Sequence, residues 1–149
     1  MEVLSLTASV IGVIQIADRI AGVCISYIDS VKDYPKDLRR IYIEVTSLKV
    51  VFQSLHFLDE DDAEDSTALQ TLRGHDGPVI GCKKAMAELS ELLPHAAPQL
   101  SRQGAKRQKL DTALAALAWP LKRERARKLL DDIIRYKLTI SVALTGELL

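Results

Sequence analysis

The residues that could do catalytic or metal chemistry are few and widely separated. Three histidines, His56, His75 and His95, match no zinc-binding spacing with either cysteine, and a tetrahedral site needs ligands that converge. Cys24 and Cys82 each lie within an apolar periodic segment. A free cysteine in such a segment behaves as a small core residue, whereas a nucleophilic thiol needs an adjacent base and partial exposure. We therefore expect no metal site and no reactive thiol.

Carboxylates and glycines also fail to form a recognisable site. Acid–base catalysis needs paired groups held in a cleft, but the clustered carboxylates lie in a polar segment, where they would repel one another and stay solvated. Gly74, Gly77 and Gly81 lack the phosphate-loop pattern and the preceding strand. The acidic cluster comprises Asp59, Glu60, Asp61, Asp62, Glu64 and Asp65. We expect a protein that is not an enzyme and has no cofactor.

Charge is unevenly placed along a chain whose formal net charge is zero. From Arg102 to Lys137 there are eleven basic and four acidic residues. Such a stretch can attract anionic lipid or nucleic acid, although a solvated helix face is the commoner meaning. Nucleic acid is not an expected partner, because Trp119 and Tyr136 are predicted core anchors and not stacking platforms. The predicted contacts with anionic lipid are Lys122, Arg123, Arg125, Arg127 and Lys128.

The composition predicts an all-α protein. The chain has 149 residues, 48% of them hydrophobic but only 5% aromatic, and the apolar weight on Leu, Ile, Val and Ala suits helix packing. We expect residues 1–149 to form a single domain, a helical bundle of four principal helices plus one or two short helices. Glu2 stands where a signal peptide would carry basic residues, so we expect an intracellular, cytoplasmic protein.

Helix boundaries follow from proline, glycine and apolar periodicity. Pro120 is expected to open the last helix, because proline is accepted in a first helical turn. Residues 95–108, with little periodicity, are expected to form a loop. The predicted principal helices cover about 3–31, 36–58, 78–93 and 120–144, with short helices at 66–73 and 110–119.

The first helix is apolar over most of its circumference. The run from Val3 to Ala17 has no charged residue, but it is shorter than the roughly 20 residues that span a bilayer core. Asp18 and Arg19 then interrupt it. Two interpretations remain open: a central helix surrounded by its partners, or a helix that is buried at rest and released into a membrane on activation.

Several short motifs together resemble a known family. These motifs are Val3 to Ile11 with Gln15, Val31 to Asp33, Pro35 to Asp37, Glu44 to Leu48, Gly77-Pro78, Trp119 to Lys122, Leu129-Leu130, Ile133, Tyr136-Lys137, Ser141 and Ala143-Leu144. In order and spacing, they are similar to the HeLo-like N-terminal domain of fungal STAND proteins, which are NOD-like receptors, and the resemblance spans nearly the whole chain.

The resemblance implies an effector domain that induces regulated cell death, in heterokaryon incompatibility or innate immunity. It implies oligomerisation with other copies, recruitment to the plasma membrane, and membrane perturbation by the N-terminal helix. Gly12 and Gly22 would allow close helix contact. The inserting residues would be Val3, Leu4, Leu6, Val10, Ile11, Val13, Ile14 and Ile16.

Asp18 and Arg19 depart from a simple membrane span, because a charge facing lipid at the bilayer centre costs a few kcal/mol or more. A shallower insertion by Val3 to Ala17, or pairing of the charges in an oligomer, would avoid that cost. The alternative hypothesis is a protein–protein interaction or homo-oligomerisation module without direct membrane activity.

Overall fold

The computed structural model describes residues 6–30, 36–60, 72, 77–93 and 105–148. These residues form four helices: α1 (Leu6–Ser30), α2 (Asp37–Glu60), α4 (Pro78–Leu92) and α5 (Ala105–Leu148). The described residues contain no strand. The all-α prediction is confirmed, and α1, α2 and α4 lie within two residues of the predicted helix ends where those ends are described.

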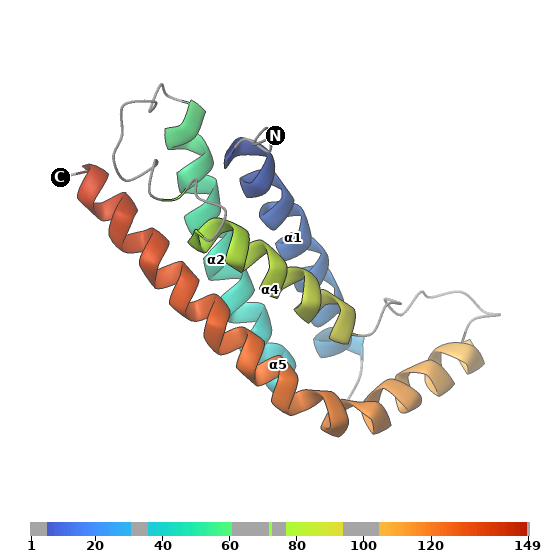
Figure 1. Ribbon diagram of the computed structural model, residues 1–149. Coiled ribbons are helices and arrows are strands. Elements are labelled where there is room, and N and C mark those ends of the chain that lie inside the picture. The colour runs from blue at the N-terminus through green and yellow to red at the C-terminus, as the bar shows by residue number, and fades with distance from the viewer. Residues whose placement is uncertain (1–5, 31–35, 61–71, 73–76, 94–104, 149) are drawn as a thin grey trace.

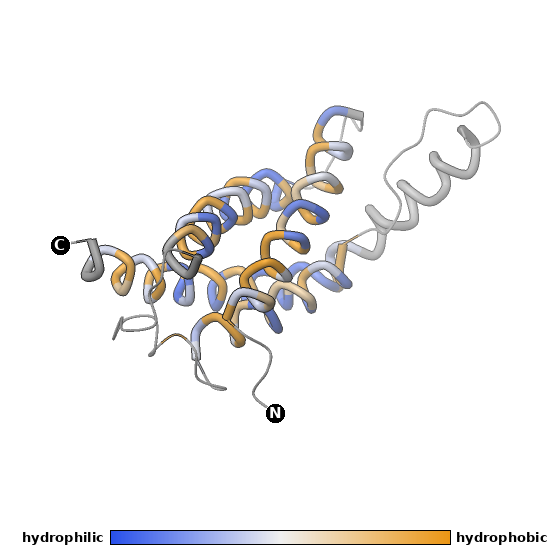
Figure 2. Tube along the Cα trace, turned by 90° about the horizontal axis from the view of Figure 1, so that it is seen from above, coloured by the Kyte–Doolittle hydropathy of each residue, from blue (hydrophilic) through white to orange (hydrophobic). Residues whose placement is uncertain are grey.

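The four helices pack as a bundle in which each helix packs mainly against two others. α1 packs mainly against α2 and also against α4, while α5 packs against α4 and α2. Figure 1 shows that α1 and α4 run in one direction and that α2 and α5 run in the other. Viewed from above in Figure 2, the apolar parts of the helices turn toward one another. The neighbouring helices α2 and α5 are therefore parallel.

A single apolar core runs between the helices. Each helix contributes residues at three- and four-residue steps, as an amphipathic stripe requires. Leu72, outside the four helices, is also buried. The core side chains of α1 and α2 are Leu6, Val10, Val13, Ala17, Ile20, Cys24, Tyr27, Leu38, Ile41, Val45, Leu48, Phe52 and Leu55; those of α4 and α5 include Val79, Cys82, Met86, Leu89, Trp119, Leu130, Ile133 and Ile140.

The predicted break at Pro120 is wrong. α5 is one helix of 44 residues with Pro120 inside it, so the expected short helix at 110–119 and the last helix are continuous. A proline inside a helix removes one backbone hydrogen bond and clashes with the preceding turn, which bends the helix without necessarily ending it. Figure 1 shows α5 changing direction in this region, with its first segment projecting away from the other three helices.

Two other predicted segments are only partly described. Residues 105–108 were expected in a loop but belong to the first turn of α5, and residues 95–104 lie outside the described residues. The expected short helix at 66–73 also lies outside them, apart from Leu72.

Candidate functional site

The predicted membrane-inserting residues of α1 divide between its inner and outer faces. Leu6, Val10 and Val13 belong to the core and are at most 7% exposed. Ile14 and Ile16 are partly buried against that core. Ile11 is 39% exposed on the outer face, and Val3 and Leu4 lie outside the described residues. α1 is thus a structural helix whose most apolar face is the one that holds the bundle together.

The charges in the middle of α1 point away from the core. Asp18 and Arg19 are both exposed. The Asp18 carboxylate pairs with Lys49 of α2, with an Oδ1 to Nζ distance of 2.5 Å. This ion pair ties α1 to α2 at the bundle surface.

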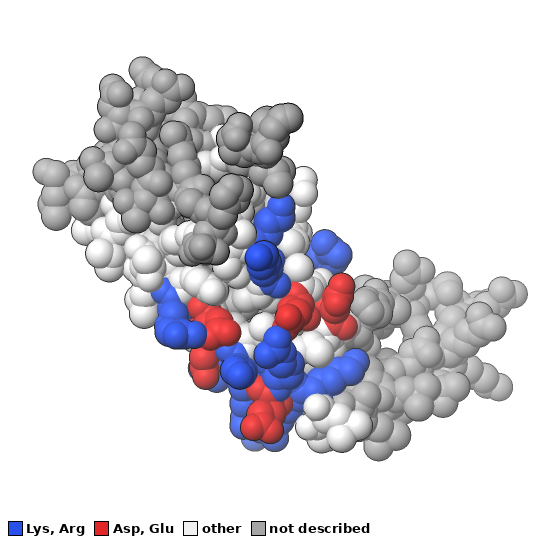
Figure 3. Space-filling model, viewed as in Figure 1, with Lys and Arg blue, Asp and Glu red and all other residues white. Residues whose placement is uncertain are grey.

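Three of the five residues predicted to contact anionic lipid are already in ion pairs between helices. Arg123 Nε lies 2.8 Å from Asp37 Oδ2, and Arg127 Nη2 lies 3.5 Å from Asp37 Oδ1. Arg125 pairs with Glu88 of α4. Lys122 and Lys128 have no ion pair among the described residues. Figure 3 shows Lys and Arg mixed with Asp and Glu over this part of the surface, which is not a patch of one sign.

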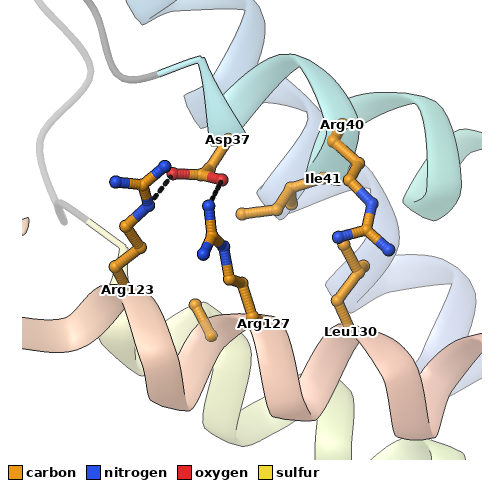
Figure 4. Close-up of a pocket in the computed structure, with 7 residues that line it drawn as sticks. Asp37, Arg40, Ile41, Arg123, Arg127 and Leu130 are labelled. Carbon is orange, nitrogen blue, oxygen red and sulfur yellow. Dashed lines mark hydrogen bonds and ion pairs between the residues drawn. The ribbon is translucent and has the colours of Figure 1, made fainter.

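Asp37 is the centre of the largest polar cluster in the described structure. Its side chain is only 18% exposed, and it also accepts a hydrogen bond from Trp119 Nε1 at 3.3 Å. Figure 4 shows the Arg123 and Arg127 guanidinium groups reaching from α5 to this carboxylate, with Arg40 beside them. Arg40 pairs in turn with Asp131 at 3.5 Å. The first turn of α2 is thereby fastened to α5 on both sides of Pro120.

Sequence reasoning missed this cluster, because Asp37 and Arg123 are far apart in the chain and only the packing of α2 on α5 brings them together. The surrounding depression is shallow. Its lining residues are Asp37, Arg40, Ile41, Arg123, Ala126, Arg127 and Leu130. A carboxylate already surrounded by guanidinium groups is suited to holding two helices together, and its charge is compensated without a ligand.

A second α2–α5 contact lies further along both helices. Lys137 Nζ lies 3.0 Å from Glu44 Oε2 and donates a hydrogen bond to Ser47 Oγ at 3.3 Å. Both charged side chains are less than a quarter exposed. The structure thus joins Lys137 and Glu44 at the edge of the core.

The closest approach of two helices at a described glycine occurs at Gly81, and not at Gly12 or Gly22, which the sequence predicted for this role. A Cβ on Gly81 of α4 would lie 2.6 Å from the Tyr136 ring of α5. A Cβ on Gly12 would lie 3.0 Å from the flexible end of Lys83, and one on Gly22 would meet nothing within 4 Å. Within this bundle Gly81 is the glycine that permits close approach, whereas Gly22 faces open space.

The cysteines lie in the core, as the sequence predicted. Cys24 and Cys82 are fully buried and free. Burial raises the pKa of each thiol to about 12, because a thiolate would lose its hydration there. Neither is a candidate nucleophile at neutral pH. No group of three or more histidine, cysteine or carboxylate side chains that could hold a metal ion occurs in the described part of the chain.

Fold and surface together define a helical-bundle domain in which several charged residues form ion pairs between helices. Comparison with known families identifies it further: over residues 1–149 the chain belongs to the family described as "Pigment biosynthesis cluster protein PigL N-terminal". This is a HeLo-like family of N-terminal domains of a fungal protein, which agrees with the HeLo-like part of the resemblance, while the assignment to STAND receptors stays a prediction. Neither the curated proteins nor the solved structures gave a match.

Proposed function

We propose that this domain is a non-enzymatic effector module of the cell-death type, which acts by self-association and by perturbing a membrane with α1. The observation that carries the proposal is the composition of α1. Within the described residues it is the one helix whose length and apolarity would allow it to span a membrane, over Leu6–Asp29. The same helix has no charge from Leu6 to Ala17.

The burial of α1 makes this activity conditional. Removing a large apolar side chain from a protein core costs about 1.5–3 kcal/mol, and α1 buries five of them: Leu6, Val10, Val13, Ile20 and Tyr27. The total is of the order of the whole stability of a domain. α1 would therefore leave the bundle only where lipid or another chain covers its inner face again, which makes the plasma membrane the proposed destination of a cytoplasmic resting state.

The basic residues of α5 would support such a transition. Lys122 and Lys128 are available for anionic headgroups in the resting bundle, whereas Arg123, Arg125 and Arg127 are held by Asp37 and Glu88. A displacement of α5 from α2 would release Arg123 and Arg127. Basic residues near an anionic surface each contribute about 1 kcal/mol to attraction.

A covalent lock on α1 tests the proposal. Carbodiimide coupling joins a lysine amine to an adjacent carboxylate, and the 2.5 Å ion pair of Lys49 with Asp18 is suited to form such a bond before lipid is added. We expect the locked protein to release no dye from anionic liposomes under conditions in which the uncoupled protein does. Lys49→Arg is the matched control, because its guanidinium keeps the ion pair but cannot be coupled.

Coupling will also join Lys137 to Glu44, and the Lys49→Arg control retains that bond. Leakage from the coupled control but not from the coupled wild type would support release of α1. Equal leakage from both would contradict it. Ile11→Glu adds a second test. Ile11 is 39% exposed, so the change should leave the core intact while reducing leakage. Gln15→Glu is the comparison variant, because it adds a negative charge on the same exposed face of α1.

The second candidate function is a protein-interaction module that does not touch lipid. The specific observation in its favour is that the large apolar side chains that are more than half exposed lie on α2 and α5, whereas those exposed on α1 are less than 40% exposed. Absence of leakage from liposomes of any charge, even when a fused assembly tag forces the domain to oligomerise, would favour this candidate.

A further inference from the structure

An apolar row runs along the outer face of α2. Ile43, Val50 and Phe57 are 58%, 58% and 67% exposed. They are spaced seven residues apart, so they return to nearly the same side of the helix, with a drift of only about 20° per interval. A row with this spacing matches the seam along which one helix packs on another. No described helix covers it.

α5 extends this row sideways. Leu138 and Val142, one turn apart, are 56% and 72% exposed. The Lys137–Glu44 ion pair at 3.0 Å joins the two parallel helices at one level. Leu138 directly follows Lys137 and Ile43 directly precedes Glu44, so Leu138 and Ile43 lie at this level too. We call Ile43, Val50, Phe57, Leu138 and Val142 together the α2–α5 face.

The exposed hydroxyl groups on these two stretches are already bonded to their own helices. Thr46 and Ser54 donate to the carbonyls of Tyr42 and Val50, at 2.6 and 3.1 Å. On α5, Thr139 and Thr145 do the same to Arg135 and Ser141, at 3.0 and 2.8 Å. A hydroxyl whose proton has a partner costs less to remove from water. The face can therefore be covered without leaving these donors unsatisfied.

The charge along α2 indicates what covers the face. Lys36 directly precedes α2, and Arg39 and Arg40 lie in its first turn, where the Asp37 carboxylate is already held by Arg123 and Arg127. The sequence of α2 ends on Asp59 and Glu60. The exposed residues of α2 from Ile43 to Phe57 carry no charge; they are Ile43, Thr46, Val50, Gln53, Ser54 and Phe57. If a second α2 is laid antiparallel with Val50 at the centre, position 43 meets position 57 and position 40 meets position 60. Apolar residues then meet apolar residues, and Arg40, whose exposed side chain pairs with Asp131 at 3.5 Å, comes near the acidic end of the sequence of the second α2.

We propose that the α2–α5 face binds a second copy of this chain through a two-fold axis near Val50, with the two α2 helices antiparallel. Such an interface is self-complementary, as two-fold symmetry requires. An anionic membrane suits the face less well, because none of the exposed residues of α2 from Ile43 to Phe57 carries a positive charge that would attract its headgroups. The inference rests on the self-association in the proposed function and assigns a surface to it. It does not depend on α1 entering a membrane, because it concerns α2 and α5 and is tested without lipid.

Single-cysteine variants test the symmetry. Under mild oxidation Val50→Cys should form a disulfide-linked dimer by itself, because only residues near the axis meet their own copies. Ile43→Cys alone and Phe57→Cys alone should not, but an equimolar mixture of the two should. Cys24 and Cys82 are buried, with thiol pKa values near 12, so they will not compete. Efficient self-linking of Ile43→Cys with none at Val50→Cys would overturn the proposed axis.

Oligomeric state tests the face as a whole. Sedimentation equilibrium of the wild-type chain should show a monomer–dimer equilibrium, and Val50→Glu should raise its dissociation constant at least about tenfold, because two like charges then meet at the axis. Leu121→Glu is the control, since Leu121 is 88% exposed but lies outside the face. Circular dichroism should be unchanged in both variants.

Two results would overturn the proposal. One is a wild-type chain that is monomeric at every concentration reached. The other is a dimer that Val50→Glu and Leu121→Glu weaken equally. If, in addition, the monomeric wild type binds phosphatidylcholine vesicles and Val50→Glu does not, the face binds lipid and the second copy is excluded.

Discussion

α1 and α2 use apolar residues in opposite ways. α1 is the more apolar helix by composition, yet its large apolar side chains mostly point into the core, and its outer face carries Asp18 and Arg19. α2 is more polar, yet Ile43, Val50 and Phe57 are more than half exposed. The helix that looks most suited to a membrane from its sequence is thus the one most committed to the bundle, and the more ordinary helix presents an uncovered apolar face.

The difference arises from position in the bundle. α1 packs against both α2 and α4, so a continuous face of it is covered. α2 covers one side of α1 and one side of α5, and the row at 43, 50 and 57 lies opposite its core positions. A high apolar content therefore indicates how much surface a helix can bury, while exposure depends on which neighbours are present.

The largest expected effect comes from placing a charge on the inner face of α1. Val13→Glu should lower the free energy of unfolding by about 4 kcal/mol or more, because Val13 is fully buried and an unpaired carboxylate would lose its hydration. Urea denaturation followed by circular dichroism measures it. Ile11→Glu, two residues away on the outer face, should cost less than about 1 kcal/mol. Similar losses in the two variants would break the contrast between the faces.

Glycine substitutions sharpen the same contrast between covered and open surface. Gly81→Ala should destabilise the domain by about 1–3 kcal/mol, because the new Cβ would overlap the Tyr136 ring. Gly22→Ala should stabilise it by about 0.5–1 kcal/mol, because alanine has the higher helix propensity and Gly22 faces open space. Thermal unfolding of both variants measures the effects. A stabilised Gly81→Ala would mean that α4 and α5 are further apart than described.

Asp37→Asn tests how α2 is fastened to α5. Loss of the carboxylate weakens two ion pairs and the Trp119 hydrogen bond, which should cost about 1–2 kcal/mol. Trp119 fluorescence should shift if the indole becomes more hydrated. Asp131→Asn is the comparison, because the side chain of Asp131 is 67% exposed, and exposed pairs contribute about 0–1 kcal/mol. An equal loss of unfolding free energy in both variants would contradict the conclusion that Asp37 holds α2 to α5.

The buried thiols predict a pH dependence. In the folded protein the neutral form of Cys24 and Cys82 is favoured, with pKa values raised from 9.0 to about 12. The unfolded chain releases these protons at lower pH, so stability is unaffected below pH 9 and falls as pH rises toward 12. The slope should reach at most about 1.4 kcal/mol per thiol per pH unit. Urea denaturation at pH 8 and pH 10 measures it, and Cys24→Ala should remove part of the slope.

The smallest expected effect is on α2. Val50→Glu should change the free energy of unfolding of the monomer by less than about 0.5 kcal/mol, because Val50 is 58% exposed and exposed substitutions are usually of that size. Dilute protein, below the dimer range, is the condition for this measurement. A loss as large as that of Val13→Glu would mean that another part of the chain covers the row.

Much of the fold could be predicted because helix periodicity is local. The three- and four-residue spacing of Leu38, Ile41 and Val45 predicts both the helix and its buried side, and Pro78 marks the beginning of α4 through its own geometry. Pro120 was misread because the same residue can open a helix or bend one. Which of these occurs depends on whether the preceding turn is held, and here Trp119 is buried and bonded to Asp37.

The candidate site was predictable only as a set of residue types. The sequence indicated that α1 is apolar and that the stretch from Lys122 to Lys128 is basic, but not that Asp37 and Glu88 neutralise three of those arginines. Ion pairs across more than thirty residues depend on how helices are placed beside one another, and no local pattern encodes that placement. Gly81 is a similar case, since its importance comes from a tyrosine 55 positions away.

By itself the sequence determined the all-α class, the positions of most helices, the burial of Cys24 and Cys82, and the apolar character of α1, because all of these follow from the side chains of neighbouring residues along one helix. Only the tertiary structure decided that the apolar side of α1 is covered, that the arginines of α5 are bound, and that Ile43, Val50 and Phe57 are left open. Exposure is a property of what lies opposite a side chain, and in this bundle those partners come from distant parts of the chain.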